Sequence, residues 1–278
     1  MDKTQPSVLV VILNYSTYDL TIKLIRELRE KLDYGNYAVM VVDNCSPNES
    51  AKVLRERQRE LGYIFYANQT NAGYAAGNNI GLRYGIEHGF HYCWILNNDV
   101  EIRETNVLSH MVEIAERDAR VGCVGPMIYS LSGEVCAPYV RRPSLWRMTL
   151  GIFHEKRLRQ RFTRRSGKVY RVYGCCMLLK SEAMAAVNCM DERTFLYGEE
   201  DILAERMLAK DYVCYYDAEV SVTHKESASV NRVSANRRRF QIRENRKSMD
   251  LYLKEYRGFS PMARWACHAV RAMITRLR

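Results

Sequence analysis

The chain has 278 residues, of which 47% are hydrophobic and 27% charged, and its formal net charge is +10. This composition excludes an intrinsically disordered chain, and the length suffices for one large domain with a buried core or for two small ones. The charge is localised, because residues 231–278 hold 13 bases and 3 acids, residues 141–171 hold 11 bases and 1 acid, and the remainder is acidic. Two basic blocks on an acidic body indicate a polyanionic partner.

Strand and helix patterns alternate in the first part of the chain. Residues 8–13 are a continuous apolar run, typical of a strand buried on both faces of a parallel sheet. This alternation predicts a doubly wound α/β layer with a mostly parallel sheet. Further strands are expected at 37–42, 63–67 and 92–96, and helices at 17–32, 49–61 and 78–87.

Polar residues stand at the carboxyl ends of these four strands, where ligands of such sheets bind. We therefore expect a ligand site at this edge. The residues are Asn14, Asp43, the segment 68–73, and Asn97, Asn98 and Asp99.

The pattern changes after about residue 120. Strands are expected at 121–129, 171–179, 212–216 and 220–224, and a helix at 194–210 after an acidic turn. From residue 234 the chain is helical and basic. We therefore divide it into a main domain, 1–230, and a basic amphipathic helical tail, 231–278.

Asn97, Asn98 and Asp99 directly follow the fourth strand. A carboxylate at a strand end can hold a divalent metal ion, and Asn97, two residues before Asp99, points to the same side. A metal ion there would neutralise the phosphates of a nucleotide. An ordinary Asx turn is the alternative.

The segment 68–81 places glycines and asparagines around a predicted helix start, among them Asn71, Gly73 and Asn78. Such a segment lets the backbone approach a ligand and supplies amide donors at a helix N-terminus. Its glycines recur at positions 73, 77 and 81, which is not a dinucleotide fingerprint. Close helix packing is the alternative explanation.

Glu199, Glu200 and Asp201 fall in the first turn of a predicted helix, where the helix dipole stabilises carboxylates. They can serve as a capping device, or one can act as a general base toward a hydroxyl. Glu200 is favoured, because Glu199 and Asp201 point elsewhere on a helix. His224 ends a predicted strand, which distinguishes it from the usual structural histidine.

The order of these motifs resembles glycosyltransferase family 2. Six motifs occur in the family's order over about residues 7–228. They are VLVVILNY, VVDNCS, NAGYAAGNNIGL, ILNNDVEI, FLYGEED and, last, His224. The sequence is most similar to the rhamnosyltransferase and galactofuranosyltransferase branch that builds bacterial surface polysaccharides. The resemblance implies the GT-A fold, a Rossmann-like and mostly parallel sheet flanked by helices, here with a C-terminal helical extension.

The resemblance also implies inverting transfer of a sugar from a UDP- or dTDP-linked donor to a hydroxyl of a saccharide or lipid-linked saccharide, with Mg²⁺ or Mn²⁺. By motif position, Asp99 and His224 would bind the metal ion, and Glu200 would deprotonate the acceptor. The donor nucleotide would be bound by Asn14, Asp43, Asn71, Gly73, Asn78, Asn97 and Asn98.

Two positions depart from the family pattern. The first carboxylate of the family's metal motif is replaced by Asn97, so Asp99 and His224 would have to supply more of the coordination of the metal ion. Many members have Glu-Asp-x-Asp where this chain has Glu-Glu-Asp-Ile at 199–202, so the base stays open among Glu199, Glu200 and Asp201. A catalytically inactive sugar-nucleotide-binding relative is therefore an alternative.

The two basic blocks suggest a membrane surface. Residues 261–278 alternate a basic face with an apolar face that carries Trp265 and Met273, as in helices that lie on anionic membranes. The alternative is that the apolar stripe docks on the body or on a second subunit of a homo-oligomer. For 141–171 we expect a mobile loop that contacts an acceptor diphosphate or the membrane, and a solvated basic surface is the alternative.

Other classes of protein fit less well. No stretch approaches the roughly 18 apolar residues of a spanning helix, and we expect no signal peptide. Nine cysteines without a CxxC pair favour reduced thiols and a cytoplasmic protein, peripheral on the inner face of the membrane. A nucleotidyltransferase would have a glycine-rich loop after the first strand, whereas residues 14–17 of this chain contain no glycine. A protein that binds nucleic acid through the basic tail, with its three arginines at 237–239, is a further alternative. No nucleic-acid-binding motif in the sequence supports such a partner.

Overall fold

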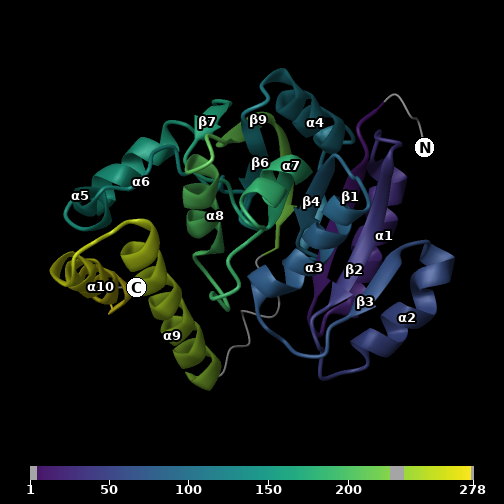
Figure 1. Cartoon of the computed structure of the whole chain (residues 1–278), viewed down its shortest axis with the longest axis horizontal. Coiled ribbons are helices and arrows are strands. Elements are labelled where there is room, and N and C mark those ends of the chain that lie inside the picture. Colours follow the sequence, from purple (N-terminus) through teal and green to yellow (C-terminus); the bar gives the residue numbers. More distant parts are fainter. Residues whose placement is uncertain (1–4, 226–234, 277–278) are drawn as a thin grey trace.

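The computed structural model describes residues 5–225 and 235–276, and in this part of the chain a nine-stranded sheet forms the centre of the molecule (Figure 1). Its strands are β1 (Val8–Asn14), β2 (Tyr37–Asp43), β3 (Ile64–Ala67), β4 (Tyr92–Leu96), β5 (Val100–Ile102), β6 (Val121–Tyr129), β7 (Gly167–Val169), β8 (Cys176–Lys180) and β9 (Val213–His224). They are ordered β3-β2-β1-β4-β8-β6-β9-β5, and β7 also pairs with β9. The first four strands are parallel, and β8 runs antiparallel between β4 and β6.

Helices cover both faces of the sheet, because successive strand residues point into two different cores. On β1, Val10 and Ile12 face one core, and Leu9 and Val11 face the other. The predicted doubly wound α/β layer is therefore confirmed. The first core is covered by α1 (Tyr18–Lys31), α2 (Ser50–Leu61) and α4 (Val107–Arg117), and the second by α3 (Tyr74–Glu87), α7 (Ser181–Ala186) and α8 (Glu199–Leu208).

Several element boundaries differ from the prediction. Helix α3 begins at Tyr74, before the expected residue 78, because Gly73 at φ 97° turns the chain directly into the helix. The strands expected at 212–216 and 220–224 are one strand, β9, because β6 pairs along it through a register shift. The strand expected at 171–179 shortens to β8, and the helix expected over 194–210 begins only at Glu199.

The block 141–171 is not the continuous loop that we expected, and its mobility stays a prediction. It contains α5 (Leu145–Met148), α6 (Ile152–Gln160) and β7. The Ser144 hydroxyl caps α5 by accepting the Arg147 N–H at 3.4 Å. Arg159 donates to the carbonyls of Ala137 and Pro138, which ties α6 to the body. Within the block, Arg147 Nε lies 3.6 Å from Glu155 Oε2, so at least two bases, Arg147 and Arg159, hold this segment in place.

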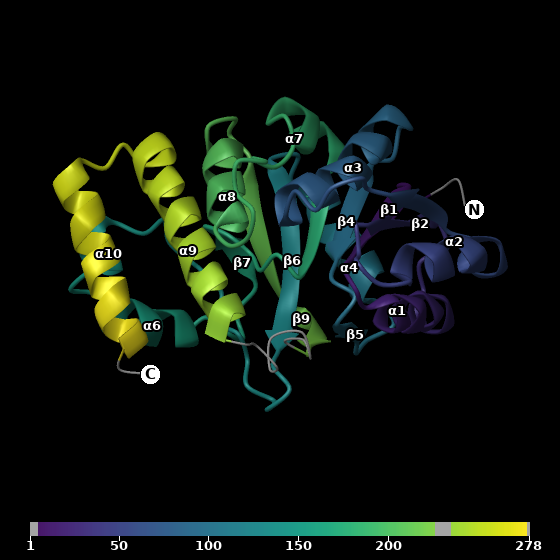
Figure 2. The ribbon, with the colours of Figure 1, turned by 90° about the horizontal axis from the view of Figure 1, so that it is seen from below.

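The C-terminal segment comprises α9 (Ala235–Leu251), a π-helical turn η1 (Tyr252–Tyr256) and α10 (Pro261–Arg276). Figure 2 shows α9 and α10 side by side, beyond α8. They join the body through a small core in which Ile202 of α8 packs with Tyr252, Leu253 and Cys267. The expected boundary at 230/231, the side chains of Arg237 and Thr275, and Leu277 and Arg278 lie outside the described residues.

Helix α10 docks by its polar face. Arg264 Nη1 lies 2.8 Å from Asp250 of α9, and Arg271 donates to Asn245 at 3.0 Å. On the other face, the side chains of Trp265 and Met273 are 71% and 57% exposed. The alternative in which the apolar stripe docks on the body is therefore wrong for the described part of α10, because polar contacts orient the helix the opposite way.

The remaining exclusions concern thiols and membrane spans. All nine cysteines are free, and seven of them are buried, as expected of thiols that serve as small hydrophobes. Over residues 5–225 and 235–276, no helix combines the length and the apolar character that crossing a membrane requires.

Candidate active site

Asn14, Asp43 and Asn98 meet at the carboxyl ends of β1, β2 and β4, as predicted. Asn14 Nδ2 donates to Asp43 Oδ1 at 2.7 Å, and Asn14 Oδ1 accepts the Thr21 hydroxyl at 2.9 Å. Asn98 Nδ2 donates to the same hydroxyl at 2.9 Å. Asp43 also accepts the N–H and hydroxyl of Ser46, at 3.0 and 2.6 Å. Because Asn14 and Asp43 are buried, this network fixes the loops that follow the strands; contact with a donor nucleotide stays a prediction.

The segment before α3 is held against β2 and the acidic turn. Asn44 Nδ2 donates to Asn71 Oδ1 at 2.9 Å and to the Gly73 carbonyl at 3.1 Å. A Cβ at Gly73 would lie 2.3 Å from the Phe195 carbonyl oxygen, so only glycine fits there. Asn78 is fully buried and donates to a carbonyl of its own helix, so it supports this segment from within.

The glycine stripe also serves helix packing, the alternative that the sequence left open. A Cβ at Gly77 would lie 2.5 Å from Leu13, and one at Gly81 would lie 2.4 Å from Val11. Both glycines therefore allow α3 to approach β1 closely.

Asp99 and His224 lie together although 125 positions separate them. Antiparallel pairing of β5 with β9 sets Val100 opposite His224. As a result, Asp99 Oδ1 lies 3.2 Å from His224 Nε2, and both side chains are largely buried. The Lys225 N–H donates to the Asp99 carbonyl at 3.0 Å and closes this end of the strand pair. The two residues that the resemblance assigned to one metal ion therefore lie side by side, and their binding of a metal ion stays a prediction.

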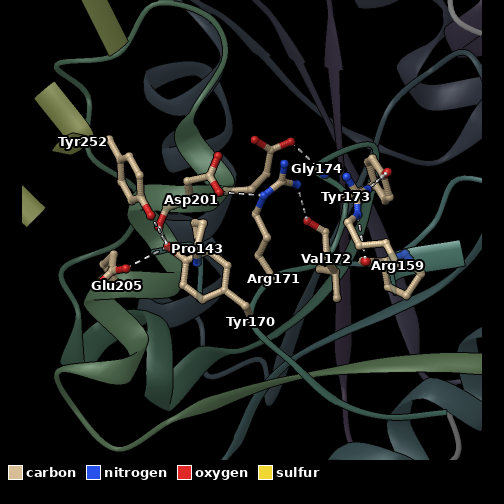
Figure 3. Close-up of polar contacts among 12 residues, drawn as sticks. Pro143, Arg159, Tyr170, Arg171, Val172, Tyr173, Gly174, Asp201, Glu205 and Tyr252 are labelled. Atoms are coloured by element: carbon tan, nitrogen blue, oxygen red, sulfur yellow. Dashed lines mark hydrogen bonds and ion pairs between the residues drawn. The ribbon is translucent and has the colours of Figure 1, made fainter. Parts of the chain in front are cut away.

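The three carboxylates of the acidic turn have different surroundings. Asp201 Oδ1 lies 2.8 Å from Arg171 Nε, which forms a largely buried ion pair (Figure 3). Glu199 is 4% exposed, and burial, followed by the neighbouring carboxylate of Glu200, raises its pKa to about 8. Glu200 Oε1 accepts the Gly174 N–H at 3.1 Å. Asp201 is thus paired with a cation, and burial favours the protonated form of Glu199. Glu200 instead accepts a backbone N–H.

Burial of Glu199 predicts a pH-dependent effect of Glu199→Gln on stability. Because its folded-state pKa is about 8 and the usual value is 4.5, the folded protein holds a proton between these pH values that the unfolded chain has released. Wild-type stability therefore falls as pH rises through this window. Relative to wild type, Glu199→Gln is expected to be more stable at pH 8 than at pH 5, by at least roughly 1 kcal/mol.

Urea unfolding of both proteins at the two pH values measures this difference. Glu56→Gln, on the exposed side of α2, is the matched control and is expected to show no such dependence. Equal changes in the two variants would contradict a neutral, buried Glu199.

One cleft, with a volume of about 430 Å³, opens at this edge of the sheet and is lined by several of the residues described above. Asn97 and His224 line it together with Glu200. Asn245 of α9 and Arg271 of α10 form part of its wall, so the C-terminal helices take part in the site. Sequence analysis did not predict this contribution.

Sequence analysis also missed Arg171 and Gly174. Arg171 was counted only as one base of the block 141–171, yet it pairs with Asp201. At Gly174, a Cβ would lie 2.8 Å from Glu200 Oε1, so glycine is what allows the backbone to donate to this carboxylate. Tyr74 adds to the contact by donating its hydroxyl to the Gly174 carbonyl at 2.6 Å. The signal in the sequence is a glycine two residues before the buried strand β8.

Comparison with known families agrees with this geometry. The family model described as "Glycosyl transferase family 2" matches residues 7–186. The chain belongs to glycosyl transferase family 2. The matched range contains the strand-end network and Asp99, and it ends before the acidic turn.

Curated relatives of this family 2 protein are distant. The chain is 26% identical over 155 residues to an N-acetylglucosaminyl-diphospho-decaprenol L-rhamnosyltransferase of Mycobacterium tuberculosis, covering 51% of this chain and 50% of that protein. It is 27% identical over 214 residues to an uncharacterized protein of Sinorhizobium fredii, covering 70% of this chain and 22% of that protein. The chain thus spans half or less of the length of these relatives.

Solved structures of glycosyltransferases share the fold. A mannosyltransferase from Pyrobaculum calidifontis in complex with GDP-Man and Mn²⁺ superposes with a TM-score of 0.62 at 18% identity, over 95% of this chain and 69% of that one. GalNAc-T7 with UDP, GalNAc and Mn²⁺ gives 0.64 at 13% identity, over 92% and 50%. TarS of S. aureus in complex with UDP-GlcNAc gives 0.61 at 12% identity, over 90% and 66%. The fold is GT-A, as the resemblance implied.

Proposed function

We propose that this family 2 protein is an inverting, metal-dependent glycosyltransferase of bacterial cell-surface polysaccharide synthesis. It moves a sugar from a UDP- or dTDP-linked donor to a hydroxyl of a saccharide or lipid-linked saccharide. The observation that carries the proposal is one cleft at the carboxyl edge of the sheet, lined by His224, which pairs with Asp99, and by Glu200. The mycobacterial relative, whose name specifies a diphospho-linked lipid acceptor, supports a lipid-linked substrate.

Asp99 and His224 fit a divalent metal ion. A carboxylate oxygen and an imidazole nitrogen 3.2 Å apart are both ligand atoms, and Mg²⁺ in nucleotide sites commonly takes few protein ligands together with substrate phosphates. In the described part of the chain no group of three His, Cys, Asp or Glu side chains could hold a metal ion. When bound, Mg²⁺ or Mn²⁺ would neutralise charge on the departing diphosphate.

Glu200 is the proposed general base. Asp201 is held by Arg171, and burial raises the pKa of Glu199 and favours its protonated form. Glu200, which lines the cleft with His224, is therefore our choice for the base. Glu200 would take the proton of the acceptor hydroxyl while that oxygen bonds to the anomeric carbon. The bond from this carbon to the diphosphate breaks on the opposite face, so the configuration inverts.

A donor assay tests the activity. The protein is incubated with UDP- and dTDP-sugars, Mn²⁺ and a lipid-diphosphate-linked saccharide, and release of the nucleoside diphosphate is measured. We expect release with one donor, dependent on both the acceptor and the ion. Binding of the donor without release under any of these conditions would favour the inactive sugar-nucleotide-binding relative.

We also propose that the protein lies peripherally on the cytoplasmic face of an anionic membrane. Helix α5 contacts α10, and both views show the α5–α6 segment beside α10 (Figures 1 and 2). Exposed large apolar side chains come from both parts, and we call them together the apolar face. They are Trp146, Leu150, Phe153, Met262, Trp265 and Met273. Bases of the two basic blocks surround these side chains in the sequence, as in helices that bind anionic membrane surfaces.

The double variant Met262→Ser/Trp265→Ser is expected to lose at least about tenfold in affinity for vesicles that contain anionic lipid, because burial of two large apolar side chains is removed. Co-sedimentation with vesicles measures binding. The control is Tyr66→Ser on β3, whose side chain is also exposed but lies outside the apolar face. Undiminished binding of the double variant would contradict this membrane surface.

A further inference from the structure

A second cavity of about 950 Å³ is lined mainly by residues of α9 and α10, and we call it the C-terminal groove. The two helices lie side by side (Figure 2). The groove adjoins the cleft of the candidate active site, because five residues line both cavities. These residues are Tyr139, Tyr197, Asn245, Met249 and Arg271. A molecule in the groove can therefore extend to the cleft that Glu200 lines.

The lining of the groove is both basic and apolar. Arg238 and Arg246 come from α9, and Arg271 comes from α10. None of the described residues that line it is Asp or Glu. Ile242 and Trp265 add large apolar side chains, both more than half exposed. Guanidinium groups bind phosphate oxygens in bidentate fashion, so this lining suits a phosphorylated group attached to a hydrocarbon chain.

The groove also continues onto the apolar face. Trp265 belongs to both, since it lines the groove and its side chain is 71% exposed. Of the block 141–171, Ile152 alone is among the described residues that line the groove. Contact with an acceptor diphosphate, which the sequence suggested for that block, is better supplied by α9 and α10.

We infer that the C-terminal groove binds the diphosphate of a lipid-linked acceptor. Arg238, Arg246 and Arg271 contact the diphosphate, the saccharide extends into the cleft toward Glu200, and the lipid follows the apolar face past Trp265. The identity of the acceptor rests on the proposed function. The affinity of the groove for a lipid diphosphate depends only on its lining.

Direct binding tests the groove without any sugar transfer. Calorimetric titration uses farnesyl diphosphate in the presence of EDTA, so that no metal-dependent donor site captures the diphosphate. Wild type is expected to bind, and Arg238→Gln/Arg246→Gln is expected to bind at least tenfold more weakly. Arg57→Gln, an exposed arginine of α2, is the matched control and is expected to bind as wild type does. Farnesol and inorganic diphosphate, each tested alone, are expected to bind more weakly than the joined molecule.

A kinetic experiment separates this inference from the proposed function. With a lipid-diphosphate-linked saccharide, Arg238→Gln/Arg246→Gln is expected to raise the KM for the acceptor at least tenfold and to change the KM for the donor far less. Arginine-dependent binding of farnesyl diphosphate without transfer by wild type would support the groove and refute the function. Transfer by wild type, with an unchanged acceptor KM and probe affinity in the double variant, would overturn the groove.

Discussion

Glu200→Gln is expected to lower kcat about a thousandfold and to leave the affinity for the donor nearly unchanged. The physical reason is that glutamine keeps a carbonyl oxygen for the Gly174 N–H, 3.1 Å from Glu200 Oε1, but cannot accept a proton from the acceptor. The measurement is single-turnover transfer at saturating donor and acceptor, together with calorimetric titration of the donor.

The two neighbouring carboxylates are the matched controls. Glu199→Gln is expected to keep most of the activity, because Glu199 is already neutral at pH 7. Asp201→Asn leaves Arg171 without its anionic partner, so its main expected effect is on the free energy of unfolding. An active Glu200→Gln beside an inactive, folded Asp201→Asn would transfer the role of base to Asp201.

Asp99→Ala and His224→Ala are expected to lower kcat/KM about a hundredfold each, because each removes a proposed ligand of the metal ion. The loss is expected to be in metal-dependent donor affinity. Titration of the nucleoside diphosphate with Mn²⁺ and with EDTA measures it: wild type binds more tightly with the ion, and the two variants bind equally under both conditions. Retention of the full Mn²⁺ effect in Asp99→Ala would contradict the metal assignment.

A gain of metal affinity provides the complementary control. Asn97 lines the cleft at the position where the family carries its first carboxylate, so Asn97→Asp is expected to lower the Mn²⁺ concentration that gives half-maximal activity. The matched variant is Asn98→Asp. It is expected to lose activity, because Asn98 Nδ2 donates to the hydroxyls of Thr17 and Thr21, at 2.8 and 2.9 Å.

Much of the fold could be predicted from the sequence, because its signals are local. The continuous apolar strands and the amphipathic helices predicted the parallel half of the sheet, and strand-end polarity predicted that Asn14, Asp43 and Asn98 would meet. The family resemblance assigned Asp99 and His224 to one metal ion, and the register of β5 with β9 brings the two side chains together. The strands, the helices and the polar strand ends depend on chain direction and side-chain period, which a sequence displays directly.

The parts that could not be predicted depend on contacts between distant segments. The pairing of Arg171 with Asp201 and the approach of Gly174 to Glu200 arise where the chain before β8 meets the N-terminus of α8. Periodicity also could not tell which face of α10 docks. Asp250 and Asn245 of α9 hold the polar side of α10, and Trp265 and Met273 on its other side are left exposed. The wall that α9 and α10 add to the cleft follows from the same docking.

The anomeric configuration of the product tests the central claim most directly. After transfer from a donor of known configuration to a saccharide acceptor, proton NMR of the product reports the configuration of the new glycosidic bond. A single displacement with Glu200 as base predicts inversion relative to the donor. Retention of the donor's configuration would contradict the proposed chemistry of this site.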